Sequence, residues 1–151
     1  MSGIADDQRE LLRALTCHGV DFVVVGGVAA QIHGWTSATL DLDIAVSSED
    51  TNVDRVNAAL ASVGASLPQV GAFGTAFTTR YGRLEIVARA DGVGRYADWL
   101  KSAHEQEVTD DLAVVVAAPD DILRSKEAAG RDKDLAALPR MRKDFEDAGS
   151  L

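Results

Sequence analysis

Short apolar runs alternate along this chain with segments whose apolar residues recur at helical spacing, which predicts interleaved strands and helices. The expected strands are short apolar runs between turn residues, at 22–25, 39–46, 77–81, 83–88, 107–108 and 112–116. The expected helices are amphipathic: one from about residue 4 to Gly19, others at 28–33, 51–63, 96–103 and 119–129, and a last one carrying Leu135, Leu138, Met141 and Phe145.

These elements follow one another too closely for a regular doubly wound parallel sheet. The runs at 77–81 and 83–88 flank Gly82, which is typical of a hairpin. We therefore expect an α+β fold, a mixed β-sheet backed by helices, with residues 1–151 forming a single domain.

Two aspartates, Asp41 and Asp43, interrupt the second apolar strand. Successive side chains of a strand point to opposite faces, so both carboxylates are expected on one face. Leu40, Leu42 and Ile44 would then face the core. Like charges on one face repel each other, and unpaired acids in a central strand are costly, but a bound divalent cation would remove that cost. A pair of exposed charges on an edge strand is the alternative.

A third carboxylate, Glu85, lies in another apolar strand. Alternation places Leu84 and Ile86 on one face of that strand, and Glu85 with Arg83 on the other. On a strand beside the aspartates, Glu85 would complete the shell of a cation or accept the proton of an attacking hydroxyl. The alternative is a solvated cross-strand partner of an arginine.

Gly26, Gly27 and Lys126 are candidate contacts for an anion. A glycine turn between a strand and a helix would let a triphosphate approach the backbone amides, although a tight turn alone also favours glycine. Lys126 is a candidate phosphate clamp, with an ordering ion pair around Asp134. A solvated charged face is the alternative for that segment.

Composition narrows the range of partners. The net charge is −9 and no run of lysine and arginine is present, so a nucleic acid would be contacted locally rather than over a broad basic face. The single cysteine, Cys17, cannot form an internal disulfide, and the acidic N-terminal residues do not resemble a signal peptide. The apolar runs are too short to cross a bilayer. We expect a cytoplasmic protein with no membrane partner.

The order of the motifs resembles a known superfamily. The glycine pair, then Thr39-x-Asp41-x-Asp43, then an acid on a later strand is similar to the minimal pattern of the DNA-polymerase-β-like nucleotidyltransferases. Residues 81–86, 92–100 and 123–138 also look like small bacterial nucleotidyltransferases related to AbiEii-type toxins. This resemblance covers most of the chain, from about residue 22 to residue 138.

The resemblance implies an α+β core with the active site on the sheet, and transfer of a nucleoside monophosphate from an NTP such as ATP to a hydroxyl. It implies Mg²⁺ or Mn²⁺ held by Asp41 and Asp43, with Glu85 in the place of the third acid. The implied nucleotide site comprises Gly26, Gly27, Thr39, Lys126 and Asp134. Two positions depart from the pattern: the third acid is more often Asp, and many toxin relatives carry Arg where this chain has Ser37.

Several acceptors and partners stay open at this point. The acceptor is RNA such as tRNA, a protein hydroxyl, or a small molecule, and the protein is a candidate component of a toxin–antitoxin pair with a toxin or antitoxin partner. An antibiotic nucleotidyltransferase of the lincosamide or aminoglycoside type is the alternative enzyme. A catalytically inactive module that binds a nucleotide or a partner is the non-enzymatic alternative, and a homodimer is also open.

Overall fold

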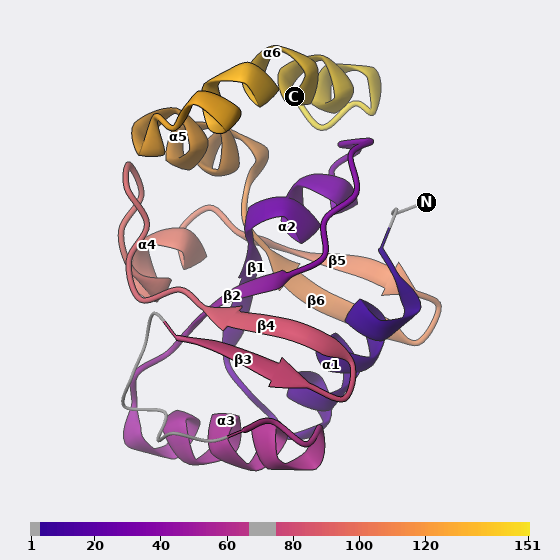
Figure 1. The fold of residues 1–151 in the computed structure, drawn as a ribbon, viewed down its shortest axis with the longest axis vertical. Coiled ribbons are helices and arrows are strands. Elements are labelled where there is room, and N and C mark those ends of the chain that lie inside the picture. Colours follow the sequence, from indigo (N-terminus) through magenta and orange to yellow (C-terminus); the bar gives the residue numbers. More distant parts are fainter. Residues whose placement is uncertain (1–3, 67–74) are drawn as a thin grey trace.

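The computed structural model describes residues 4–66 and 75–151, which form six strands and six helices (Figure 1). The strands are β1 (Phe22–Val25), β2 (Leu42–Val46), β3 (Ala76–Thr79), β4 (Gly82–Ile86), β5 (His104–Thr109) and β6 (Leu112–Val116). The helices are α1 (Asp6–Cys17), α2 (Gly26–Ile32), α3 (Asp50–Ser62), α4 (Tyr96–Leu100), α5 (Pro119–Ala129) and α6 (Asp132–Asp147).

All six strands form one sheet in the order β3-β4-β2-β1-β6-β5. Sequential neighbours pair antiparallel, as in the expected hairpin of β3 and β4, whereas β2 pairs parallel with β4 and β1 pairs parallel with β6. The expected α+β fold with a mixed sheet is confirmed. β2, which carries the acidic motif, lies inside the sheet rather than at its edge.

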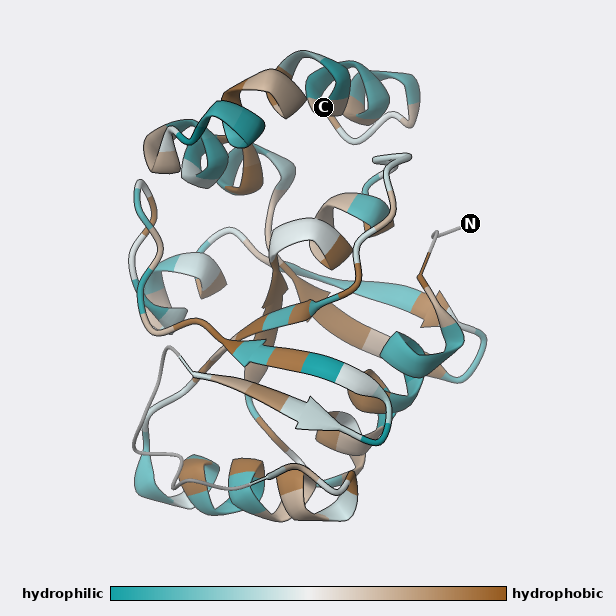
Figure 2. Ribbon diagram, in the orientation of Figure 1, coloured by the Kyte–Doolittle hydropathy of each residue, from teal (hydrophilic) through white to brown (hydrophobic). Residues whose placement is uncertain are grey.

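The central strands supply the core. All four residues of β1 are buried, and Leu42 and Ile44 of β2 are fully buried. Figure 2 shows continuous hydrophobic residues along β1 and an alternation of hydrophobic and hydrophilic residues along β2 and β4. In the register of β2 and β4, Asp43 and Glu85 share one face, opposite the buried Leu42, Ile44, Leu84 and Ile86. Helix α2 packs against β1, β2 and α5, and α5 packs against α6 at one end of the molecule (Figure 1).

Several element boundaries differ from those expected. β2 begins at Leu42 rather than at residue 39, and Leu40 is 88% exposed, so the prediction that Leu40 faces the core is wrong. The glycine pair opens α2 instead of forming a turn before it. α4 ends at Leu100, and β5 begins at His104 rather than at residue 107.

Within the described part of the chain, none of the helices combines the length and the apolar character that spanning a membrane requires.

Candidate functional site

The three predicted acids meet at one cleft. Asp43 and Glu85 are direct partners in the parallel pair of β2 and β4, so their side chains lie on the same face of the sheet. Asp41 immediately precedes β2 and lines the same cavity as the other two acids. Its Oδ2 lies 3.4 Å from Nε of Arg83, which is on β4 two residues before Glu85. The structure thus gathers three carboxylates and one guanidinium on two adjacent strands.

The pKa of Asp43 is strongly raised. Burial, followed by the negative charges of Glu85 and Asp41, raises the pKa of Asp43 to about 7, against the opposing effect of Arg83 and Lys126. The positive charges near this carboxylate therefore only partly offset the cost of its ionised form. Such a carboxylate in a cleft is typical of a functional site.

The carboxylates fit a divalent cation by their chemistry, but they do not form a closed shell. Mg²⁺ prefers carboxylate and water oxygens, and it is usually bound through only one or two protein carboxylates. Among residues 4–66 and 75–151, no group of three or more His, Cys, Asp or Glu side chains is arranged closely enough to hold a metal ion. A cation that used Asp41 would have to displace Arg83 from it. The placement of Asp43 beside Glu85 on one face of the sheet, with both lining the cleft, is the structural observation that favours the fit.

The glycine pair allows two other motif residues to approach α2. A Cβ atom on Gly26 would collide with Oδ2 of Asp43, and one on Gly27 would lie 2.9 Å from Oγ1 of Thr39. Gly26 also has a φ of 66°, which residues with a side chain rarely adopt. The glycines are therefore required by close packing of the acidic motif against α2, and not by a turn alone.

Gly26→Ala is expected to destabilise the protein by roughly 1–3 kcal/mol more than Gly82→Ala. Both glycines have a positive φ, but nothing lies within 4 Å of a Cβ atom on Gly82. The difference between the two variants, measured by urea unfolding, therefore isolates the collision with Asp43. In an Asp43→Ala background this difference should shrink. Equal losses for both variants would show that Asp43 does not press against Gly26.

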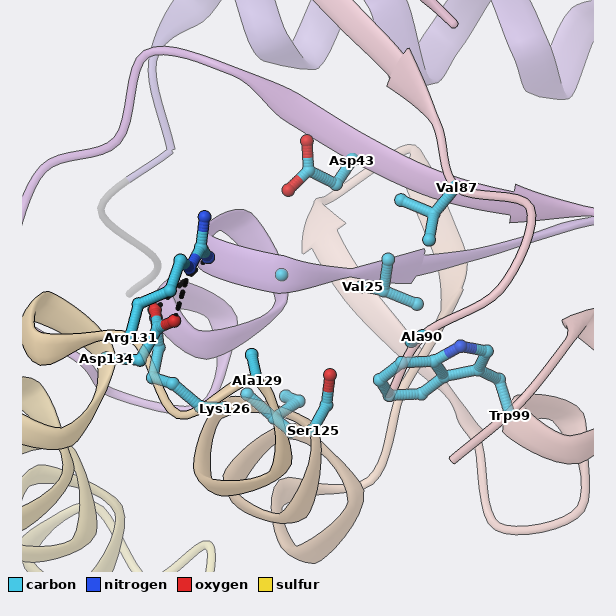
Figure 3. Close-up of a pocket in the computed structure, with 13 residues that line it drawn as sticks. Val25, Asp43, Val87, Ala90, Trp99, Ser125, Lys126, Ala129, Arg131 and Asp134 are labelled. Atoms are coloured by element: carbon cyan, nitrogen blue, oxygen red, sulfur yellow. Dashed lines mark hydrogen bonds and ion pairs between the residues drawn. The ribbon is translucent and has the colours of Figure 1, made fainter. Parts of the chain in front are cut away.

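A buried acid organises the basic side of the cleft. Asp134 on α6 is 1% exposed and binds Arg131 through Nε at 2.5 Å and Lys126 through Nζ at 3.3 Å (Figure 3). Burial alone would raise the pKa of Asp134, but these two hydrogen-bonded cations outweigh it and hold the pKa below its usual value. Nζ of Lys126 also lies 5.6 Å from the ring centroid of Trp35. The expected ion pair around Asp134 is present.

The cleft has two adjoining compartments, which share Gly27, Asp43, Lys126, Arg131 and Asp134. The outer compartment, about 570 Å³, is mainly polar, and its other walls include Trp35, Ser37, Thr39, Asp41, Glu85 and Lys133. The inner compartment, about 180 Å³, is largely apolar, and its other walls include Val25, Val87, Ala90, Trp99, Ile122 and Ser125. In Figure 3, Asp43 faces the cavity across from Lys126, Arg131 and Asp134.

Every site residue singled out in the sequence lies at this cleft: Gly26, Gly27, Thr39, Asp41, Asp43, Glu85, Lys126 and Asp134. The contact between Arg83 and Asp41 was not predicted. Strand alternation had already placed Arg83 on the face of Glu85, but only the register of β2 and β4 shows which acid it reaches.

Comparisons with known proteins support the fold. No protein-family model and no curated protein matches the sequence. Solved structures do match. The solution structure of the antibiotic-resistance factor ANT(2'')-Ia is 15% identical with a TM-score of 0.62, over 94% of this chain and 86% of that one. An antigenic nucleotidyltransferase-like protein from Paracoccidioides brasiliensis is 17% identical with a TM-score of 0.56, over 99% of this chain and 88% of that one. At these identities the likeness concerns the fold alone.

Proposed function

We propose that this chain is a metal-dependent nucleotidyltransferase that moves a nucleoside monophosphate from an NTP to a hydroxyl and releases pyrophosphate. The observation that carries the proposal is the pairing of Asp43 with Glu85 across the cleft from Lys126, on a nucleotidyltransferase-like fold. The raised pKa of Asp43 supports the same interpretation, because a bound cation would stabilise its ionised form.

The residues divide into an acidic and a basic side. Mg²⁺ or Mn²⁺ bound through one or two of the carboxylates of Asp41, Asp43 and Glu85, with water completing its shell, would neutralise the triphosphate and lower the pKa of the acceptor hydroxyl. Lys126 would neutralise the phosphates from the opposite side of the cleft, and Asp134 would fix its position. The triphosphate itself would lie against the surface formed by Gly26, Gly27 and Thr39.

The proposed reaction is an in-line displacement at the α-phosphorus. The acceptor oxygen forms a bond to that phosphorus, the bond to the β-phosphate bridging oxygen breaks, and pyrophosphate leaves. The hydroxyl proton passes to a carboxylate, for which Glu85 is the candidate because it lies beside Asp43 on the same face. Positioning and charge stabilisation supply most of the rate in phosphoryl transfer, so the cleft needs no covalent intermediate.

The acceptor divides the proposal into two branches. The leading branch is a hydroxyl of RNA such as tRNA, or of a protein side chain, within an AbiEii-related toxin–antitoxin pair. The second branch is an antibiotic, and the similar fold of an antibiotic-resistance factor favours it. The net charge of −9 also favours a small cationic acceptor over a large RNA footprint.

An inactive binding module is a separate, non-enzymatic candidate, favoured by the pairing of Asp41 with Arg83.

Incubation with each α-labelled NTP, Mg²⁺ and a cell extract tests the proposal, with Asp41→Ala as the matched control. We expect one macromolecule or metabolite to become labelled by the wild type and not by the variant. A thermal-shift titration with each NTP, with and without Mg²⁺, distinguishes the remaining outcomes. Stabilisation without pyrophosphate release across broad acceptor screens would favour the binding module, and no stabilisation by any NTP would contradict both proposals.

Arg83→Gln is expected to strengthen Mn²⁺ binding about threefold to tenfold, because the cation no longer competes with a guanidinium 3.4 Å from Asp41. The affinity is measured by titration with detection of free Mn²⁺. Arg80→Gln is the control, since it removes the same charge from the same hairpin, where Arg80 instead donates to the backbone of Ser62. Equal effects of both substitutions would mean that only the general charge of the hairpin matters.

A further inference from the structure

Three buried polar side chains converge on the segment that joins α2 to β2. Gln8 comes from α1, Gln31 from α2 and Asp144 from α6, and they are 4%, 5% and 7% exposed. Residues 36–38 of the segment are themselves exposed and belong to no helix or strand. The segment is therefore held by side chains from three helices rather than by a backbone ladder.

Gln8, Gln31 and Asp144 hydrogen-bond to main-chain atoms of the segment at residues 36, 37 and 39. Oδ2 of Asp144 accepts from the backbone N–H of Thr36 at 3.1 Å and from its hydroxyl at 3.0 Å. Nε2 of Gln31 donates to the carbonyl of Ser37 at 2.8 Å, and Nε2 of Gln8 donates to the carbonyl of Thr39 at 2.9 Å. Contacts to main-chain atoms fix the path of the chain, whichever side chains the segment carries.

The path so fixed determines where the acidic motif begins. Oγ1 of Thr39 lies against Gly27, and Asp41 follows two residues later at the edge of the outer compartment. Between them the chain turns Leu40 out to solvent. The hydrogen bond from Gln8 to Thr39 thus lies two residues before Asp41, a proposed cation ligand. Gln8 acts at this distance because α1 does not itself line the cleft.

Local stability explains only part of these side chains. Oε1 of Gln8 accepts from the backbone N–H of Ala5 at 3.1 Å and so caps the start of α1. That cap does not account for Nε2 of Gln8, which is directed to Thr39 from a buried face shared with Leu11, Leu12 and Leu15. Oε1 of Gln31 is buried and has no hydrogen-bond partner among the described residues, which is unfavourable. Polar groups placed at a cost in a core are retained where they specify one arrangement.

We infer that Gln8 and Asp144 are positioning residues, which pre-organise the wall of the cleft that presents Thr39 and Asp41. The catalytic consequence rests on the proposed function, whereas the ordering of the segment does not. The end of α6 is docked on the same region, because Oγ of Ser150 donates to the carbonyl of His33 at 2.8 Å and Gly34 packs against Asp144 and Ala148. Asp144 therefore links the C-terminal helix to the acidic motif.

Gln8→Met tests the inference, because methionine keeps the length of the side chain and removes its hydrogen bonds. Asn52→Leu is the matched control. Asn52 is a 1% exposed amide that holds another loop through Asp21 and Ser47, outside the cleft. Both variants should lose stability in urea unfolding. Only Gln8→Met should weaken Mn²⁺ binding and binding of a non-hydrolysable NTP, by about tenfold or more, and only Gln8→Met should speed hydrogen exchange at residues 36–41.

The proposed function and the positioning inference are overturned by different outcomes. A wild-type protein that binds no NTP would contradict the proposed function. Unchanged hydrogen exchange at residues 36–41 in folded Gln8→Met would overturn the positioning inference, whatever the nucleotide data. Weakened Mn²⁺ binding of equal size in Gln8→Met and Asn52→Leu would also overturn it, because the effect would then follow stability alone. If Gln8→Met does not fold, Asp144→Asn takes its place. Mn²⁺ binding and NTP binding are measured in the same way, and hydrogen exchange is measured at Thr36, which Asp144 contacts.

Discussion

Asp43→Asn is expected to lower nucleotidyl transfer at least about 10³-fold while the protein remains folded. Asparagine has nearly the same shape as aspartate, so the packing against Gly26 survives, but the negative charge that a cation and the triphosphate require is lost. Transfer is measured by release of pyrophosphate with the acceptor found in the labelling experiment, and the fold by circular dichroism. Full transfer by the folded variant would contradict the proposed mechanism.

The same substitution should stabilise the cation-free protein at neutral pH. The pKa of Asp43 is about 7 in the folded protein and 3.8 as its ordinary value, so between these values the folded state binds more protons than the unfolded state. The free energy of unfolding of the wild type therefore falls as pH rises from about 4 to about 7. The asparagine of the variant has no such titration, so the advantage of the variant should grow over that window and be complete above it.

Urea unfolding at pH 5 and pH 8 without divalent cations measures this advantage. Adding Mg²⁺ at pH 8 should stabilise the wild type more than the variant, since the variant lacks one of the three proposed carboxylate ligands. Asp54→Asn, on the exposed face of α3, serves as the control for removing one negative charge away from the cleft. The electrostatic account of Asp43 would be wrong if the two variants gained equally at both pH values.

Alternation along each strand was sufficient to predict the face on which the acidic side chains lie. Alternation along a strand depends only on neighbouring residues, so the sequence predicted correctly that Leu42 and Ile44 are buried beside Asp43. It also predicted Glu85 on the opposite face from Leu84, as the structure has it. These predictions needed no knowledge of which strands are neighbours.

Long-range contacts account for what the sequence did not predict. Leu40 continues the apolar alternation, yet it is exposed because β2 begins only at Leu42, and the carbonyl of Thr39 is bound instead by Gln8, far away in the sequence. The glycine pair was ambiguous because its reason lies in Asp43, which approaches from another strand. A pattern within one segment does not reveal which distant side chain will restrain it.

On the basic side of the cleft, one feature was predictable from local sequence and another depended on long-range contacts. Gly130 was expected to interrupt the helical segment, and it does, with a φ of 65° between α5 and α6. The direction of the second helix after that break was not predictable from spacing. The turn brings Asp134 back to Lys126, so two residues eight apart meet in one partly buried ion pair.

Lys126→Met is expected to lower transfer about 10²- to 10³-fold, mainly through weaker binding of the NTP. The cleft loses the positive charge proposed to bind the triphosphate. The pKa of Asp43 also rises further, because Lys126 is one of the groups that lower it. A higher pKa means that a cation must displace a proton over a wider pH range.

The fold should survive this substitution, because Arg131 still binds Asp134 through both Nε and Nη2. Lys133→Met is the matched control: it removes a lysine from the outer compartment that makes no ion pair among the described residues. Binding of a non-hydrolysable NTP and the pH dependence of Mn²⁺ affinity are measured for both variants. We expect Lys126→Met to weaken NTP binding but not Mn²⁺ binding well above pH 7, because Asp43 is then ionised in both proteins and the lost positive charge no longer repels the cation. An NTP affinity equal to that of Lys133→Met would show that Lys126 serves only to hold Asp134.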